Sequence, residues 1–278
     1  MSEHTYIAYQ NDLSQFQYFF QQQFELEEAS EVKLIHIRSW LADMKEHKVG
    51  ERTLQRKISS LRALFKYLMK NKLVDTNPTL QVTNPKAPKR LPVYLEEKDT
   101  IRITKEIAYA AGFEGCTERL IMELLYQTGI RRAELVNLKE SDVEFSRKQI
   151  RVLGKRNKER MIPVAEELLI DIRHYMDEKR KIFNQPDVKL LSLKTGKPVY
   201  DQYVYRVVTK YLSGITTLTK KSPHVLRHTF ATQLSNNGAE LNAVKDLLGH
   251  SSLAATQVYT HNNIQRLKEV YRKAHPKS

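Results

Sequence analysis

An arginine two residues after a glycine gives the first indication of the chemistry of this chain. Arg131 follows the helix-breaking pair Thr128-Gly129, and Glu134 stands three residues later, where its carboxylate could aim the guanidinium group. A guanidinium group is planar, keeps its charge and forms paired hydrogen bonds with phosphate oxygens. Arg/Glu pairs at this spacing are also common on helix surfaces, so the motif alone fits a phosphate site or an ordinary helix face.

The segment His224-Val-Leu-Arg-His228 adds a second arginine and two histidines. On a helix, His224 and Arg227 share one face, and His228 lies one turn after His224. The His-x-x-x-His spacing could also bind a metal, but Val225 stands where the zinc-protease motif needs its glutamate. Because of this mismatch, no metal site is expected.

The segment Leu247-Leu-Gly-His-Ser-Ser252 predicts the end of one helix and the start of another. Gly249 suits a helix C-cap, which places His250 in the turn. Tyr259 then falls at the far end of the following short helix. Taken singly, each residue fits a structural role, since a histidine or one of the chain's 14 tyrosines is commonly buried in a core.

The chain from about Pro92 onwards is expected to be mainly helical, with one small antiparallel sheet. Alternating patterns predict strands over 142–145, 149–153 and 160–164, with Lys155 near the tip of the last hairpin. Apolar periodicity predicts helices over 118–127, 132–138, 165–184, 201–212, 225–236, 241–248, 254–259 and 263–273.

The first part of the chain predicts a small all-helical domain, residues 1–83, with helices over 5–24, 32–47 and 51–71. Residues 1–44 contain two basic and seven acidic side chains, whereas residues 45–90 contain twelve basic and three acidic ones. This steep gradient favours a helix that faces nucleic acid over a merely solvated one. The candidate DNA-binding side chains on the third helix are Arg52, Arg56, Arg62, Lys66 and Lys70.

Residues 84–92 contain three prolines and predict an extended linker before a second domain, residues 93–278. Lys86, Lys89 and Arg90 in this linker would suit a strap across a phosphate backbone. The expected fold is therefore mainly α, with an all-helical first domain and an α+β second domain.

Composition narrows the class of protein further. The 278 residues carry a formal charge of +14 and are 41% hydrophobic, which suits a folded protein with a polyanionic partner. The single Cys116 excludes an intramolecular disulfide and a multi-cysteine zinc site. Without a signal-peptide pattern or a long apolar run, the expectation is a cytoplasmic protein without a membrane span.

Six residues fall in the order and spacing of the tyrosine recombinase (phage-integrase) family: Arg131, Lys155, His224, Arg227, His250 and Tyr259. Residues 128–135 resemble the family's first arginine box, residues 224–232 its His-x-x-Arg box, and residues 247–261 its nucleophile box. The ending 265–277 resembles the Xer branch, and the resemblance spans essentially the whole chain. It departs at Arg156, where the hairpin often has a second glycine, and Lys158 stands close enough to compete with Lys155 for the family's lysine position.

The resemblance implies a site-specific recombinase that cleaves and rejoins DNA through a 3′-phosphotyrosyl intermediate, without metal, ATP or another cofactor. Arg131 and Arg227 would stabilise charge on the phosphate. His224 and His250 would add hydrogen bonds, and His224 could accept the proton of the nucleophile. The nucleophile would be Tyr259, Lys155 would protonate the leaving 5′-oxygen, and Glu134 would support Arg131.

The same resemblance implies a clamp around duplex DNA in the nucleoid, as a homo- or heterotetramer on two sites. An amphipathic tail with Ile264, Leu267, Val270 and Tyr271 would then dock on a neighbouring subunit, although packing on its own chain is an alternative. Chromosome-dimer resolution and mobile-element integration or excision both fit. A type IB-like topoisomerase and a non-catalytic DNA-binding protein on the same scaffold are the competing hypotheses.

Overall fold

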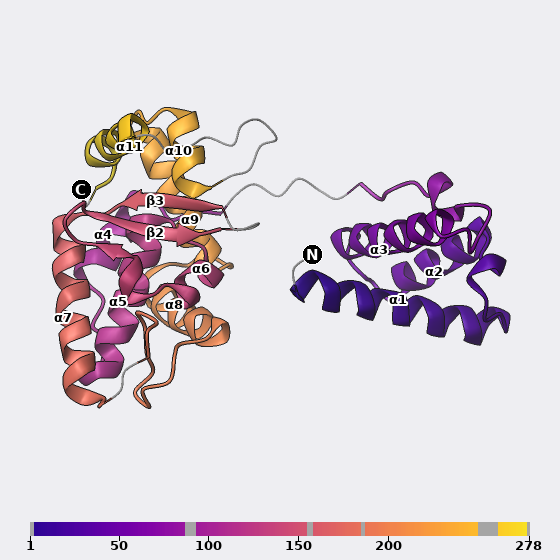
Figure 1. The fold of residues 1–278 in the computed structure, drawn as a ribbon, viewed down its shortest axis with the longest axis horizontal. Coiled ribbons are helices and arrows are strands. Elements are labelled where there is room, and N and C mark those ends of the chain that lie inside the picture. The colour runs from indigo at the N-terminus through magenta and orange to yellow at the C-terminus, as the bar shows by residue number, and fades with distance from the viewer. Residues whose placement is uncertain (1–2, 87–92, 155–157, 185–186, 250–260, 277–278) are drawn as a thin grey trace. The chain divides into compact units, whose positions relative to one another are not determined.

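The computed structural model describes residues 3–86, 93–154, 158–184, 187–249 and 261–276 (Figure 1). The chain divides into two compact units, Met1–Arg90 and Leu91–Ser278. Helices dominate both units and a small sheet lies in the second, so the predicted fold class is confirmed. Among the described residues, no helix has the length and apolarity that a membrane crossing needs.

The first unit contains α1 (Glu3–Phe24), α2 (Leu34–Glu46), α3 (Glu51–Lys70) and two short 3-10 turns, Ala29–Glu31 and Pro78–Gln81. The apolar stripe predicted on the third helix forms the core of this unit, since Leu54, Ile58, Leu61 and Phe65 are each 1% exposed. Trp40 of α2 packs edge-on against Phe16 of α1, with ring centroids 5.0 Å apart. Burial of these stripes fixes the three helices against one another.

The second unit surrounds the long buried helix α5 (Gly112–Thr128), which contacts α7 (Glu166–Ile182), α8 (Asp201–Ile215) and α9 (Pro223–Asn236). Ile121, Leu124 and Leu125 of α5 are completely buried. The remaining helices are α4 (Glu97–Lys105), α6 (Arg132–Asn137), α10 (Leu241–Leu248) and α11 (His261–Ala274), and Glu140–Asp142 forms a 3-10 turn.

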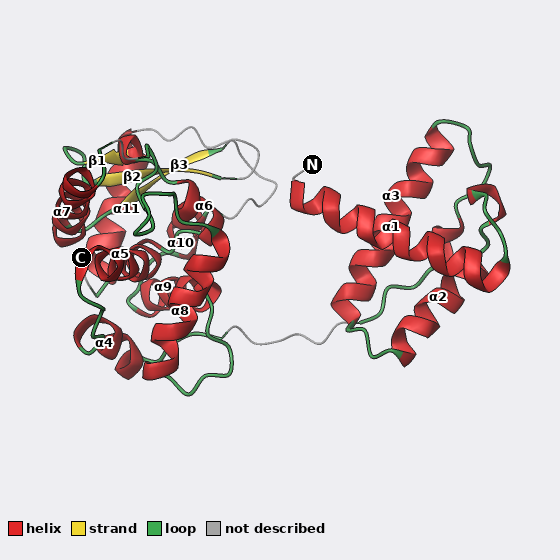
Figure 2. Ribbon diagram, turned by 90° about the horizontal axis from the view of Figure 1, so that it is seen from below, coloured by secondary structure: helices red, strands yellow, loops and turns green. Residues whose placement is uncertain are grey.

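Three antiparallel strands, β1 (Val143–Glu144), β2 (Gln149–Leu153) and β3 (Glu159–Pro163), lie together at one side of this otherwise helical unit (Figure 2). The register pairs Ile150 with Ile162 and Val152 with Arg160. α10 and α11 both pack against β3, so the hairpin formed by β2 and β3 is in direct contact with the C-terminal helices. Each strand lies within one residue of its predicted range: β2 matches it, β3 is shifted by one residue, and β1 is one residue shorter at each end.

Two helical regions differ from the sequence prediction. α4 was not predicted, and α5 begins at Gly112 instead of residue 118. The early turns of α5 contain poor helix formers and are held by tertiary contacts: Thr117 Oγ1 donates to Ser192 O at 3.1 Å. A methyl group at Gly115 would lie 1.7 Å from Ala110 O, so glycine permits a close backbone approach there. The predicted helix 254–259 lies outside the described residues.

The tail helix α11 packs on its own unit, which is the alternative that the sequence left open. Leu267, Tyr271 and Ala274 are buried in a cluster with Phe230 and Leu234 of α9 and with apolar residues of α10. The side-chain amide of Asn237 also donates to Ala274 O at 2.6 Å. The end of α11 is therefore held against α9 within the chain.

Candidate active site

The candidate site forms where two helices end in left-handed glycines. Gly129 (φ +59°) terminates α5, and Gly249 (φ +62°) terminates α10, as its predicted role as a C-cap requires. A side chain at Gly129 would also collide with Phe230, because its Cβ would lie 2.5 Å from the ring. The last carbonyls of a helix lack partners within the helix and carry partial negative charge. These two helix ends therefore attract cations.

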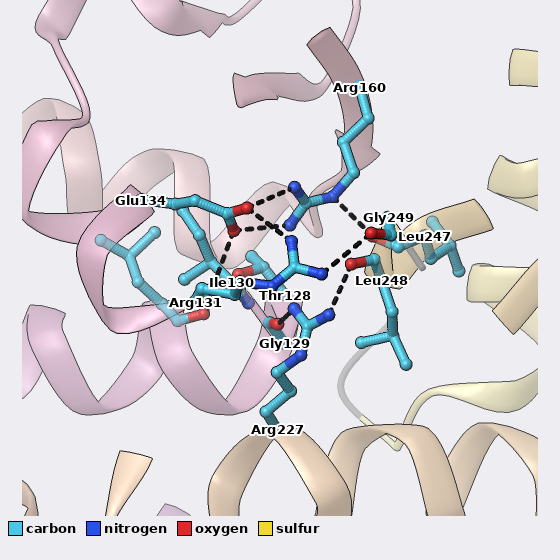
Figure 3. Close-up of polar contacts among 11 residues, drawn as sticks. Thr128, Gly129, Ile130, Arg131, Glu134, Arg160, Arg227, Leu247, Leu248 and Gly249 are labelled. Atoms are coloured by element: carbon cyan, nitrogen blue, oxygen red, sulfur yellow. Dashed lines mark hydrogen bonds and ion pairs between the residues drawn. The ribbon is translucent and has the colours of Figure 1, made fainter. Parts of the chain in front are cut away.

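Arg227 of α9 links the two helix ends (Figure 3). Its Nη1 donates to Gly129 O and its Nη2 donates to Leu248 O, both at 2.5 Å. The residue is 8% exposed, so its charge sits in a low-dielectric surrounding. The contacts fix the plane of the guanidinium group between α5 and α10.

Arg131 lies beside Arg227 and contacts the same end of α10 (Figure 3). Its Nη2 donates to Gly249 O at 2.9 Å, and its Nη1 donates to Glu134 Oε1 at 2.7 Å. The backbone N–H of Arg131 also donates to Glu134 Oε2 at 2.8 Å. The structure thus brings Arg131, Glu134 and Arg227 together from α6 and α9.

Arg160 of β3 completes the cluster and was missed by the sequence prediction. It donates through Nη1 to Glu134 Oε1 and through Nη2 to Oε2, both at 2.8 Å, and its side chain is 4% exposed. The strand pattern contained a usable signal: Arg160 shares its parity with Ile162 and Val164, both buried. A charged residue on the inward face of a strand needs a buried partner.

The cluster holds three guanidinium groups and one carboxylate. Burial alone would raise the pKa of Glu134, but the hydrogen bonds and charge of Arg160, and then those of Arg131, outweigh it, so this pKa lies below its usual value. Burial and the positive charges of Arg131 and Arg160 lower the pKa of Arg227 to about 9. Arg227 remains charged at neutral pH, and a bound anion would relieve the repulsion among the three cations.

His224 lies in the first turn of α9, one turn before the arginine that it was predicted to accompany. Desolvation, the neighbouring His228 and the positive charges of Arg132, Arg227 and Arg131 lower its pKa below 6.5. The imidazole is therefore neutral at physiological pH and able to accept a proton.

Three predicted site residues, Lys155, His250 and Tyr259, lie outside the described residues. The chain neighbours of two of them belong to the cluster. Gly249 accepts from Arg131, and a methyl group at Gly154 would lie 3.8 Å from Glu134 Oε1. The assignment of these three residues to the site remains a prediction.

The basic residues of the first unit fall into two groups. Arg56 is tied to Asp12 and to Ala8 O, and Arg62 donates to Val82 O at 2.7 Å and to Asn84 Oδ1 at 3.1 Å. These two arginines hold the unit together, which the sequence did not indicate. Arg56 is nevertheless exposed, as are the candidates Arg52, Lys66, Lys70 and Lys86, whereas Lys89 and Arg90 lie outside the described residues.

Family models match both parts of the chain: residues 94–266 match the phage integrase family, and residues 1–72 match the phage integrase N-terminal SAM-like domain. The chain belongs to the phage integrase (tyrosine recombinase) family. The tyrosine recombinase XerC of Listeria innocua is 36% identical over 280 residues, covering 100% of this chain and 93% of the relative. That of Staphylococcus haemolyticus is 37% identical and is covered over 92% of its length by the whole of this chain.

Solved structures show the same recombinase fold. XerA recombinase aligns at 25% identity with a TM-score of 0.51, over 100% of this chain and 94% of that chain. XerH in a post-cleavage complex with a palindromic difH substrate aligns at 22% identity with a TM-score of 0.74, over 94% of this chain and 77% of that one. The family match and the XerC relatives show that the protein is a DNA strand-transferring enzyme of the recombinase type.

Proposed function

We propose that this recombinase cleaves and rejoins DNA at a specific site through a 3′-phosphotyrosyl intermediate in which Tyr259 is the nucleophile. The observation that carries the proposal is the meeting of Arg131 and Arg227 at the ends of α5 and α10, with Glu134 as the one carboxylate paired with them among the described residues. A cluster with this excess of positive charge suits a phosphodiester, whose nonbridging oxygens gain charge during attack.

The proposed step balances without a further reagent. Tyr259 Oη forms a bond to phosphorus while the bond from phosphorus to the 5′-oxygen breaks and its electron pair passes to that oxygen. Neutral His224 accepts the tyrosine proton, and Lys155 donates a proton to the leaving oxygen. Arg131, Arg227 and His250 hydrogen-bond the phosphate oxygens. The tyrosyl ester conserves bond energy, so the reverse step can rejoin a strand.

We assign DNA recognition to the helical domain 1–83, a strap across the phosphate backbone to the linker 84–92, and strand transfer to residues 93–278. The exposed Arg52, Lys66, Lys70 and Lys86, with Lys89 and Arg90, are proposed as phosphate contacts. The enzyme is proposed to act in the cytoplasm, on nucleoid DNA, as a homo- or heterotetramer on two sites. In that assembly α11 would leave its own groove and enter that of a neighbour.

The XerC relatives favour a Xer-like role in chromosome partition over a phage-type role. The phenotype of a deletion strain distinguishes two roles: resolution of chromosome dimers and movement of an integrated element. A deletion strain that accumulates unresolved chromosome dimers supports the first, whereas a strain that only retains an element in place supports the second.

A nicked suicide duplex tests the nucleophile. The DNA target site is first recovered from a pool of randomised duplexes, as the DNA that forms detergent-resistant complexes with the protein. The purified protein is then incubated with a nicked duplex of that site in the presence of EDTA. Wild type and the matched control Tyr205→Phe, altered at an exposed tyrosine of α8, should form a covalent adduct, and Tyr259→Phe should form none. An adduct that survives Tyr259→Phe would overturn the assignment. Relaxation of arbitrary supercoiled DNA as efficient as relaxation of DNA that carries the site would favour a topoisomerase. Binding of the duplex without any adduct would favour a non-catalytic DNA-binding protein.

A further inference from the structure

We infer that Arg160 is a positioning residue of the recombinase: it aims Arg131 at the phosphate and fixes the end of α10, without reaching DNA itself. The inference rests on the proposed function for the reaction that it serves, and on the buried contacts of Arg160 for its role. Its side chain is 4% exposed and all three described donations end on protein oxygens.

The first contact is a fork that fixes a carboxylate. Both oxygens of Glu134 bridge Arg160 to Arg131: Oε1 accepts from a guanidinium nitrogen of each arginine, and Oε2 accepts from Arg160 Nη2 and from the backbone N–H of Arg131. A carboxylate held by a two-point guanidinium pair cannot rotate. Glu134 therefore transmits the position of β3 to the guanidinium group of Arg131.

The second contact fixes the chain immediately before His250. Three arginines bind three successive carbonyls at the end of α10: Arg160 Nε binds Leu247 O at 2.8 Å, and Arg227 and Arg131 bind the next two. Gly249 packs on Arg160 so closely that a Cβ there would lie 3.0 Å from Arg160 Cδ. Arg160 thus sets where the chain enters the segment that carries His250 and Tyr259.

The third contact concerns the hairpin that carries Lys155. Arg160 pairs with Val152 across the two strands, and a methyl group at Gly154 would lie 3.9 Å from Arg160 Nη1. One buried side chain therefore connects α6, the end of α10 and the base of the hairpin. These are the elements that carry or adjoin Arg131, His250 and Lys155.

The substitution Arg160→Lys separates positioning from charge, because lysine keeps the charge but has no planar fork. Lys179 offers a matched control. It is also a fully buried cation of the second unit, and its Nζ donates to Glu140 Oε1 at 2.9 Å and to Asp187 O at 2.7 Å, outside the arginine cluster. Lys179→Gln therefore disturbs a comparable buried ion pair without touching the site.

In single-turnover cleavage of the suicide duplex, Arg160→Lys should be about 10- to 100-fold slower, with DNA affinity unchanged at the same salt concentration. Lys179→Gln should cleave at the wild-type rate per folded molecule. In a Glu134→Gln background, Arg160→Lys should cost less than it does alone, because the connection through Glu134 is already broken and only the contact with Leu247 O remains to be lost. Additive losses, or equal loss in the Lys179 control, would overturn the inference.

The pH profile is a readout that a merely structural role would not move. Glu134 faces Arg131 and Arg160, with Arg227 close by. Without the fork of Arg160, the pKa of the buried carboxyl rises, and cleavage by Arg160→Lys should fall on acidification at a pH where wild type is still unaffected. The double variant with Glu134→Gln should lack this acid limb.

A measurement independent of activity separates this inference from the proposed function. In protein labelled with 15N-arginine, the guanidinium signals of Arg131, assigned through Arg131→Lys, should show restricted rotation in wild type and free rotation in Arg160→Lys. Unchanged signals would overturn the positioning role. Altered signals in a protein that forms no adduct would leave the positioning role standing and reject the proposed strand transfer.

Discussion

Each unit contains a buried carboxylate held by two cations, and the two clusters serve different ends. In the first unit, Asp12 accepts from Lys57 Nζ at 3.1 Å, from Ser60 Oγ at 2.8 Å and from Arg56. In the second unit, Glu134 accepts from Arg131 and Arg160. Both clusters join segments that are distant along the chain.

The difference lies in what surrounds the pairs. We call the Asp12 cluster closed, because its cations donate further hydrogen bonds within the first unit. Lys57 Nζ also donates to Gln15 at 2.5 Å, and Arg56 also donates to a backbone carbonyl of α1. The Glu134 cluster contains a third arginine whose bonds end on neutral carbonyls. The Asp12 cluster has two cations for one carboxylate and the Glu134 cluster has three, so the larger excess of positive charge gives the Glu134 cluster the capacity to bind an anion.

The largest effect is expected from breaking the closed cluster. Asp12→Asn leaves Lys57 buried without its counter-ion and should lower the free energy of unfolding of the first unit by about 3–5 kcal/mol. Trp40, the single tryptophan, lies in that unit, so its fluorescence in urea reports this unfolding selectively. The control Asp43→Asn removes an exposed partner of His47 and should cost less than about 1 kcal/mol. Equal losses would contradict the assignment of Asp12 to a structural cluster.

In the Glu134 cluster, which we call open because of its larger excess of positive charge, a substitution should change the rate of DNA cleavage. Arg227→Lys keeps a charge but loses the fork that spans Gly129 and Leu248, and single-turnover cleavage should fall by about 100- to 1,000-fold. Lys57→Gln, in the closed cluster, should cleave at the wild-type rate at a temperature where the first unit stays folded. If both variants lose cleavage equally, the functional distinction between the clusters is wrong.

The pH dependence of stability sharpens the comparison for Glu134. Because its folded-state pKa is lowered, its stabilising contribution is present above the unfolded-state value of about 4.3 and is lost as the pH falls through the folded-state pKa. Glu134→Gln should therefore cost about 1–3 kcal/mol at pH 7, and this difference should shrink on acidification. Urea unfolding of the second unit, followed by circular dichroism at several pH values, measures it. A difference that does not change with pH would contradict the ion pairing.

The smallest effect concerns cations outside both clusters. Lys66→Ala removes an exposed charge of α3 and should reduce the slope of log affinity against log salt by about one. Lys181→Ala, which removes an exposed lysine paired with Glu178 on α7, should leave the slope unchanged. Equal slopes for all three proteins would place Lys66 away from DNA.

Patterns in the sequence correctly predicted those features that depend on residues close together in the chain. The apolar stripe of α3 and the glycine cap at Gly249 follow from periodicity and backbone conformation, and both are confirmed. The start of α5 was misjudged because contacts of Thr117 with residues far along the chain outweigh poor helix propensity. Arg160 escaped notice because its partners lie 26 and 87 residues away, and no local pattern shows which carboxylate a buried arginine meets.

The carbonyls that hold Arg131 and Arg227 are far from these arginines in the sequence. This separation determines when the arginine pair can assemble during synthesis of the chain. Arg131 is held by a carbonyl 118 residues downstream, and Arg227 by one 98 residues upstream. A ribosome releases the helices of the first unit before Arg131, and it releases residue 249 only 118 residues after Arg131. The proposed DNA contacts of the first unit can therefore form before the arginines of the second unit are positioned for strand cleavage.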